Sequence, residues 1–185
     1  MASIRATRFE YMEAVEKFLK TESYASDNVL EISGKTKPWT SHFGRLTTTQ
    51  FPAVDAEALP FEDESYDCVI MNQVLEHCKR PWLCVGEASR VLRKGGMLIM
   101  SSPFIYQVHD WPGDYYRFTP EGLICLGKSA GLTEVLLNHR GGNPSMLKHA
   151  INYPQDRCSE QFVNAAKRNE DKSLYFMSST VVMRK

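Results

Sequence analysis

The sequence has no excess of charge of either sign and no long apolar run. Lysine and arginine together number 22, as do aspartate and glutamate, so the formal net charge is zero. This balance argues against a nucleic-acid partner, which usually requires a basic surface. No apolar run approaches the roughly 20 residues of a membrane-spanning helix, and the first residues lack the apolar core of a secretory signal. We therefore expect a cytoplasmic protein with no membrane partner.

Paired cysteine motifs are also missing. The five cysteines are an odd number and include no C-x-x-C pair. This usage indicates reduced, mostly buried thiols. His77, Cys78 and Cys84 lie close together in the sequence, but their spacing matches no zinc pattern, so no metal site is predicted.

What the chain does have is the composition of one folded domain. It has 185 residues, of which 43% are hydrophobic and 24% charged. That length is sufficient to bury a core, and the composition is typical of a globular protein. No repeat, low-complexity tract or linker divides the chain, so residues 1–185 are expected to form a single domain. The sequence does not indicate an oligomeric state.

Apolar strands alternate with helical patterns, which predicts an α/β fold with a doubly wound, mostly parallel sheet. The expected strands are residues 29–32, 45–49, 66–71, 97–104, 133–139 and 175–185. The expected helices lie within residues 1–26, after Pro81 and after Thr119, and residues 145–171 are expected to form a polar helical insertion. The apolar face of the first helix would consist of Phe9, Met12, Val15, Phe18 and Leu19.

Start and stop signals define the two inner helices. Pro81 suits the first turn of a helix, and Lys94-Gly95-Gly96 is expected to end that helix. Its apolar stripe would consist of Leu83, Val85, Ala88, Val91 and Leu92. Thr119-Pro120-Glu121 combines a capping hydroxyl, a proline and an acidic residue at the start of the next helix, which Gly131 would close.

Residues 55–77, DAEALPFEDESYDCVIMNQVLEH, are the most informative segment of the chain. They combine a loop, an acidic turn, a buried strand and a polar strand end. In an open α/β sheet, ligands bind in the crevice outside the carboxyl ends of the strands. We expect Asp55, Asn72 and Gln73 to lie at that edge.

This segment resembles the middle of the class I S-adenosylmethionine-dependent methyltransferases of small-molecule type. These carry D-x-x-x-LPF-x-(D/E)-x-S-(F/Y)-D-x-V and then LEH. Two further segments, RVLRKGG at 90–96 and HDWPGDYYRFTPEGL at 109–123, are similar to segments of the same family. The resemblance implies a Rossmann-like fold with an antiparallel last strand, S-adenosylmethionine as cofactor, and methyl transfer to oxygen or nitrogen of a small-molecule acceptor. A catalytically inactive binding or partner protein with this fold is the alternative.

The first loop departs from the family pattern. Members usually carry V-L-(D/E)-I-G-x-G-x-G, whereas this chain has VLEISGKTK. Glu31 keeps the acidic position, and Gly34 is expected to supply one left-handed turn. Lys35 and Lys37 would either face the methionine carboxylate or narrow the pocket. The stretch from Ile32 to Asp55 is shorter than a βαβ crossover usually requires, so a helix is expected to be lost there.

The resemblance implies the positions of a cofactor site. Its predicted residues are Glu31, Ser33, Gly34, Lys35, Asp55, Ala56, Glu57, Asn72, Gln73, Val74 and His77. Asp55 would either accept from the adenine amino group or cap a turn. Glu31 would either hold the cofactor's ammonium or bond to loop backbone. His77 would either touch cofactor or acceptor, or bond to backbone.

The acceptor site is expected in the segment that follows the fourth strand, since functional loops leave strand ends. The predicted substrate-binding residues are Trp111, Tyr115 and Tyr116. The predicted catalytic residues are His109, Asp114 and Arg117. His109 would be a general base, or part of a hydrogen-bond network that fixes the loop. Arg117 would bind an anionic acceptor, or pair with Asp114 to hold the loop.

Overall fold

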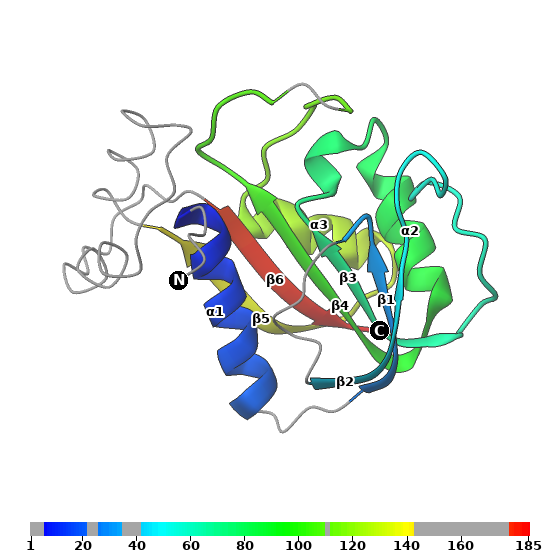
Figure 1. Cartoon of the computed structure of the whole chain (residues 1–185). Coiled ribbons are helices and arrows are strands. Elements are labelled where there is room, and N and C mark those ends of the chain that lie inside the picture. The colour runs from blue at the N-terminus through cyan, green and yellow to red at the C-terminus, as the bar shows by residue number, and fades with distance from the viewer. Residues whose placement is uncertain (1–5, 22–25, 35–41, 110–111, 143–177) are drawn as a thin grey trace.

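Six strands form one sheet in the computed structural model, which describes residues 6–21, 26–34, 42–109, 112–142 and 178–185 (Figure 1). The strand order is β2-β1-β3-β4-β6-β5. The strands are β1 (Ser26–Ile32), β2 (Phe43–Thr48), β3 (Tyr66–Asn72), β4 (Leu92–Pro103), β5 (Glu134–Gly141) and β6 (Ser178–Arg184). Strands β2, β1, β3 and β4 are parallel. Strand β6 lies antiparallel between β4 and β5. The predicted α/β fold, including its antiparallel last strand, is confirmed.

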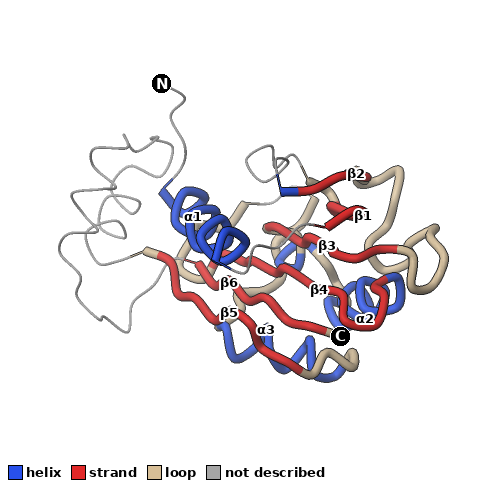
Figure 2. The backbone as a smooth tube through the Cα atoms, turned by 90° about the horizontal axis from the view of Figure 1, so that it is seen from below, coloured by secondary structure: helices blue, strands red, loops and turns tan. Residues whose placement is uncertain are grey.

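Helices cover both faces of this sheet (Figure 2). Helix α1 (Ala6–Thr21) packs on one face, and α2 (Pro81–Val91) and α3 (Pro120–Ser129) pack on the other. Alternate residues of β3 face opposite sides because side chains alternate along a strand. Val69 and Met71 join the core under α2 and α3, while Cys68 and Ile70 join the core under α1. None of the described helices is both long and apolar enough to cross a membrane.

Two expectations for α2 are wrong. The helix ends at Val91, and Leu92 already begins β4, so Lys94-Gly95-Gly96 lies inside a strand rather than at a helix end. Leu83 is 37% exposed. The buried positions of α2 include Pro81, Cys84, Val85, Ala88 and Val91. They follow the helical repeat from Pro81, and Leu83 falls outside that stripe.

The other helix signals are confirmed. Met12, Val15 and Leu19 of α1 are buried. The side chain of Thr119 accepts a hydrogen bond from the backbone N–H of Gly122, which caps α3. Residues 33–42 separate β1 from β2, and because residues 35–41 lie outside the described part of the chain, the expected loss of a helix there stays a prediction. The predicted helical insertion at 145–171 lies outside the described residues.

The LPF motif at residues 59–61 is fastened to α2 by two side chains. The Glu87 carboxylate accepts from the backbone N–H of Leu59 at 2.8 Å and from Arg90 at 2.8 Å. Arg90 donates to the carbonyl oxygens of Leu59 at 2.9 Å and Phe61 at 2.8 Å. Its hydrogen bond lowers the pKa of Glu87. This clamp fixes the loop that begins at Asp55.

The clamp leads to a stability prediction. We expect Glu87→Gln to lower the free energy of unfolding at neutral pH by about 1–2 kcal/mol, because it weakens charge-assisted hydrogen bonds. The pKa of Glu87 is depressed in the folded state, so its stabilisation is present above about pH 4 and is lost as the pH falls through the folded pKa. Urea denaturation at pH 7 and near pH 3 measures both effects.

The matched control for this prediction is Asp63→Asn. Asp63 also pairs with Arg90, at 2.7 Å, but its side chain is 73% exposed. Its replacement should change the free energy of unfolding by no more than about 0.5 kcal/mol. An equal loss for Glu87→Gln at both pH values would contradict the charge-based account.

Candidate functional site

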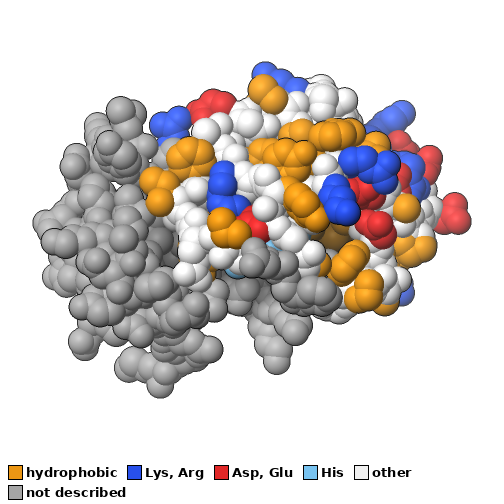
Figure 3. Space-filling model, turned by 90° about the horizontal axis from the view of Figure 1, so that it is seen from above, with side chains coloured by type: hydrophobic (Ala, Val, Ile, Leu, Met, Phe, Trp, Pro, Cys, Tyr) orange, Lys and Arg blue, Asp and Glu red, His pale blue; other side chains and the backbone are white. Residues whose placement is uncertain are grey.

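The carboxyl ends of β1, β2, β3 and β4 lie at the same edge of the sheet because these strands are parallel. Loops from all four strands therefore meet there, which is where open α/β sheets bind ligands. Seen from above, the molecule gathers apolar side chains around a hollow, with histidine at the surface nearby (Figure 3). Phe51, Val108 and Tyr115, from the loops after β2 and β4, are exposed large hydrophobic residues.

The loop after β1 is joined to the end of β2. The backbone N–H of Ser33 donates to Thr49 Oγ1 at 3.1 Å, and Gln50 Nε2 donates to the carbonyl oxygen of Gly34 at 2.8 Å. The backbone N–H of Thr49 donates to the carbonyl oxygen of Glu31 at 3.0 Å. Sequence reasoning missed Thr49 and Gln50. Their signal in the sequence was the polar end of the strand expected at residues 45–49.

The left-handed residue of this loop is Ser33, with φ 52°, rather than Gly34. The expectation for Gly34 is therefore wrong in its reason. A Cβ at Gly34 would overlap the side chain of Glu31, so a larger residue at this position would require Glu31 to move. Glu31 itself is only 2% exposed. Lys35 and Lys37 lie outside the described residues, so their predicted role stays a prediction.

The loop after β2 holds Asp55 in a turn. Its Oδ1 accepts from the backbone N–H of Glu57 at 2.9 Å, which confirms the turn-capping alternative. Asp55 is exposed and Ala56 is buried. Glu57 forms an ion pair with Arg80 at 2.6 Å, so its carboxylate holds the loop against the start of α2. An adenine contact by Asp55 is compatible with this geometry and stays a prediction.

A polar network closes the ends of β3 and β4. Ser101 Oγ donates to Asn72 Oδ1 at 2.7 Å and accepts from Gln73 Nε2 at 3.2 Å. The backbone N–H of Gln73 donates to the carbonyl oxygen of Ser101 at 3.0 Å. Gln73 has a positive φ of 55°, a conformation that costs energy for a side chain of this kind. Val74 is buried beside it. Ser101 was missed because nothing in the sequence distinguishes it within its strand.

The short helix η2 (Leu75–His77) follows this network and carries Glu76 and His77. The ring nitrogen Nδ1 of His77 bonds to the carbonyl oxygen of Gly113, which confirms the backbone-bonded alternative. Burial lowers the pKa of His77 and raises the pKa of Glu76 to about 8. Glu76 was not among the predicted site residues, although a charged residue within a few positions of the end of a buried strand was a usable signal.

The segment after β4 is organised around Asp114, whose side chain is 1% exposed. Both of its oxygens accept from Arg117, which confirms that this arginine pairs with it. Asp114 Oδ2 also accepts from the backbone N–H of His109 at 3.0 Å. The Arg117 guanidinium holds the pKa of Asp114 well below its usual range. Arg117 further donates to the carbonyl oxygens of Gln107 at 3.2 Å and Tyr116 at 2.8 Å.

The three predicted acceptor residues differ in placement. Tyr115 is 48% exposed, and its backbone N–H donates to the carbonyl oxygen of Glu76 at 2.7 Å. Tyr116 donates its hydroxyl to the carbonyl oxygen of Lys79 at 3.2 Å and stacks on Phe118. Trp111 lies outside the described residues. Tyr115 therefore has the most accessible side chain of the two that are described.

His109 connects this segment to η2. Its ring meets the ring of His77 edge to face, with centroids 4.8 Å apart, and that of Tyr106 at 5.4 Å. The structure thus brings together His77, His109, Asp114 and Arg117 from the predicted residues. It does not unite His77, Cys78 and Cys84 as ligands; the ligand-type group that forms around His77 contains Glu76 and His109 instead.

Comparison with known proteins gives a consistent result. Residues 11–100 match the family model described as a methyltransferase domain. An uncharacterized methyltransferase of Mycolicibacterium paratuberculosis is 35% identical over 102 residues, which are 55% of this chain and 34% of that protein. The matched segments cover between 19% and 38% of the length of the curated relatives, well under half of each.

Two solved structures show the same fold at low identity. Phosphoethanolamine N-methyltransferase 2 of Haemonchus contortus, in complex with phosphomonomethylethanolamine and S-adenosylhomocysteine, superimposes with a TM-score of 0.60 and 16% identity. The alignment covers 95% of this chain and 52% of that one. The [4+2]-cyclase SpnF also gives a TM-score of 0.60 at 16% identity, over 94% of this chain and 80% of its own. The fold alone therefore does not define the reaction.

Proposed function

Because this chain belongs to the class I S-adenosylmethionine-dependent methyltransferase family, we propose that it transfers a methyl group from S-adenosylmethionine to oxygen or nitrogen of a small-molecule acceptor. The observation that carries the proposal is the convergence of four held loops at the carboxyl edge of the sheet. Methyl transfer is an in-line displacement at a sulfonium methyl group. The protein has to align acceptor, methyl and sulfur and to exclude water, and fixed loops suit this task.

The cofactor would lie across the ends of β1, β2 and β3. Asp55 and Ala56 would contact adenine. The clamp of Glu87 and Arg90 supports this role, because it fixes the loop that follows these two residues and so holds them at the edge of the sheet. The methionine part would lie by Ser33 and Gly34, whose backbone is tied to the end of β2. The left-handed Gln73 turns the chain at the end of β3, beside the expected position of the methyl group.

The acceptor would lie under the segment that follows β4. Exposed Tyr115 and Val108 offer apolar surface, and the Asp114–Arg117 pair holds this segment in place. His109 is the candidate base for an acceptor that must lose a proton. Its ring lies against His77, one-third exposed, in a position that suits proton transfer or metal ligation.

Calorimetry with S-adenosylmethionine and S-adenosylhomocysteine tests the proposal directly. We expect Asp55→Asn to weaken binding of both at least several-fold, because a charge-assisted hydrogen bond in a desolvated pocket contributes about 1.5–3 kcal/mol. The variant should retain the wild-type unfolding midpoint, since the amide oxygen still accepts from Glu57.

Glu62→Gln is the matched control for Asp55→Asn. Glu62 is an exposed acidic residue of the same loop region, so its change should leave cofactor affinity unaltered. Unchanged affinity in a folded Asp55→Asn variant would remove Asp55 from the cofactor site. Failure of the wild-type protein to bind either compound at millimolar concentration would overturn the proposed function.

A second candidate is a non-catalytic binding protein with the same fold. The observation in its favour is the first loop, where the Glu31 side chain occupies the space next to Gly34 and a serine takes the left-handed position. Such a protein would retain the edge of the sheet without binding the cofactor. The same calorimetric titration distinguishes the two candidates.

A further inference from the structure

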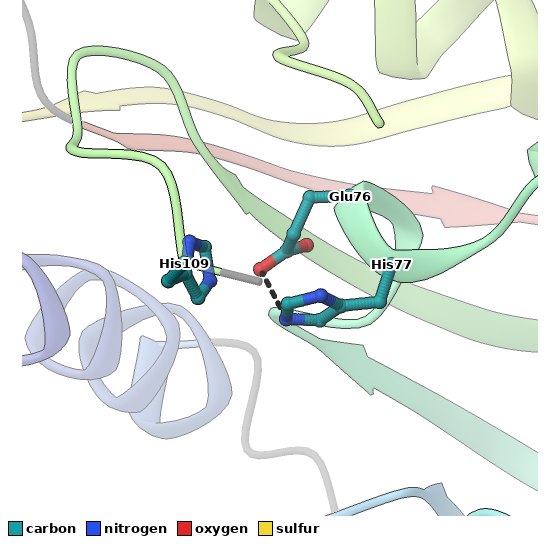
Figure 4. Close-up of side chains that lie close together, drawn as sticks. All are labelled: Glu76, His77 and His109. Carbon is teal, nitrogen blue, oxygen red and sulfur yellow. Dashed lines mark ion pairs between the residues drawn. The ribbon is translucent and has the colours of Figure 1, made fainter. Parts of the chain in front are cut away.

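Three metal-ligand side chains meet at the carboxyl edge of the sheet, from two segments far apart in the sequence. Glu76 and His77 belong to η2, and His109 comes from the loop after β4 (Figure 4). One ligand atom from each lies within 4.8 Å of the others. Both imidazole rings lie beside the Glu76 carboxylate in Figure 4.

Glu76 is the unusual member of this cluster. Its side chain is 0% exposed, and within the described part of the chain neither carboxylate oxygen has a hydrogen-bond partner. The near neighbour is His77 Nε2, at 3.8 Å from Oε1. A buried carboxyl group without partners is costly, so such groups are usually paired or bound to a metal. The geometry therefore leaves a position for a cation.

Each histidine has one ring nitrogen close to an oxygen of a neighbouring residue, and for His77 this contact is a hydrogen bond. A carbonyl oxygen can only accept a hydrogen bond, so His77 Nδ1 carries a hydrogen and donates it to the carbonyl oxygen of Gly113. In the neutral imidazole, Nε2 then has a free lone pair, and this nitrogen lies on the side of Glu76. Asp114 Oδ2 lies 3.0 Å from His109 Nδ1, although the two are not aligned for a hydrogen bond. Metal-bound histidines commonly have such carbonyl or carboxylate partners.

We propose that Glu76, His77 and His109 bind one divalent transition-metal ion. Two imidazoles and a carboxylate suit Zn²⁺, Mn²⁺, Co²⁺ or Fe²⁺ better than Mg²⁺ or Ca²⁺, which prefer oxygen ligands. Bond lengths of about 2.0–2.2 Å at tetrahedral angles separate ligand atoms by about 3.3–3.6 Å. The 3.8 Å separation of His77 and Glu76 is close to this range, and the span of 4.8 Å requires side-chain movements of about 1 Å in total.

Three protein ligands leave coordination positions open for water or for an acceptor oxygen. A bound metal lowers the pKa of such a hydroxyl, so the acceptor class that fits is a hydroxyl compound. The hydroxyl proton would pass to solvent, the oxygen would bond to the methyl carbon, and the carbon–sulfur electrons would stay on sulfur. This extension rests on the proposed methyl transfer, whereas metal binding itself does not.

Calorimetric titration of the full, EDTA-treated chain with Mn²⁺ and with Zn²⁺ tests the site. We expect one ion to bind per chain. We expect Glu76→Gln and His77→Ala each to weaken metal binding at least about 10-fold, because mutation of residues that only hold the metal ligands already has an effect of that size. Titration with Co²⁺ should give visible absorption that both variants lose. Circular dichroism and the unfolding midpoint in EDTA verify that each variant is folded.

His42→Gln is the matched control, since His42 precedes β2 and stands outside the cluster. It should bind metal like the wild-type protein. No stoichiometric binding by the wild-type protein, or equal weakening in His42→Gln, would overturn the site. Calorimetry with S-adenosylmethionine in EDTA distinguishes the metal site from the proposed methyl transfer. A wild-type protein that binds the cofactor but no metal would contradict the metal site and leave the proposed function standing. Hydroxyl methylation that proceeds equally well in EDTA would contradict the acceptor extension.

Discussion

Replacing Asp114 by asparagine is expected to lower the free energy of unfolding by about 2–3 kcal/mol. The carboxylate is almost fully buried and receives hydrogen bonds from Arg117 and from the backbone of His109. Asparagine offers the guanidinium of Arg117 one acceptor oxygen and no negative charge, so the partly buried guanidinium loses its counter-charge. Urea denaturation measures the loss, and amide hydrogen exchange should increase across the described residues of 105–118.

The double variant Asp114→Leu with Arg117→Met is the control for this effect. Removing both charges leaves no unpaired ion, so its free energy of unfolding should lie closer to that of the wild-type protein than that of Asp114→Asn does. If Asp114→Asn were as stable as the wild-type protein, the pair would not hold the segment, and the loop-fixing account of Arg117 would be wrong.

Glu76→Met is expected to raise the free energy of unfolding in EDTA by about 1–3 kcal/mol, a change in the opposite direction. Methionine has nearly the shape of glutamate and removes two buried oxygens that have no hydrogen-bond partner among the described residues. Glu76→Gln should gain less, because its amide group is still buried. Denaturation in urea with EDTA measures these differences.

Added Zn²⁺ or Mn²⁺ should reverse this order, because a ligand that binds only the folded state stabilises it. The wild-type protein would gain stability with metal, and Glu76→Met would not. A less stable Glu76→Met variant in EDTA would indicate that the carboxylate has a structural partner. Denaturation with and without metal therefore shows whether Glu76 serves metal binding or stabilises the fold.

The fold was largely predictable because its signals are local. Apolar runs such as residues 66–71 and the cap at Thr119 define elements through side-chain periodicity and hydrogen bonding to nearby backbone. The end of α2 was misplaced because the glycine pair at 95–96 resembles a helix stop. In the structure these glycines lie inside β4, where Gly95 has a φ of 78°.

The candidate site was predictable only in part, because its contacts join distant segments. The sequence placed His109 and Arg117 in one loop and left two roles open for each. The structure shows the pairing of Arg117 with Asp114, while binding of an acceptor by Arg117 stays a prediction. The proximity of Glu76 to His109, and that of Ser101 to Asn72, depends on how β3 and β4 pair. The spacing of residues along the sequence does not show how these two strands pair.

The position of β6 has a consequence for the order of events during synthesis. Residues 178–184 occupy the slot between β4 and β5, with Val181, Val182 and Met183 fully buried. Until the ribosome has released this stretch, one backbone edge of β4 and one of β5 have no strand to pair with. Nascent chains in that state expose unpaired strand edges, which are prone to pair with other chains and aggregate. We therefore expect the yield of folded protein to depend more on chaperone binding to this incomplete sheet than on the stability of the individual helices.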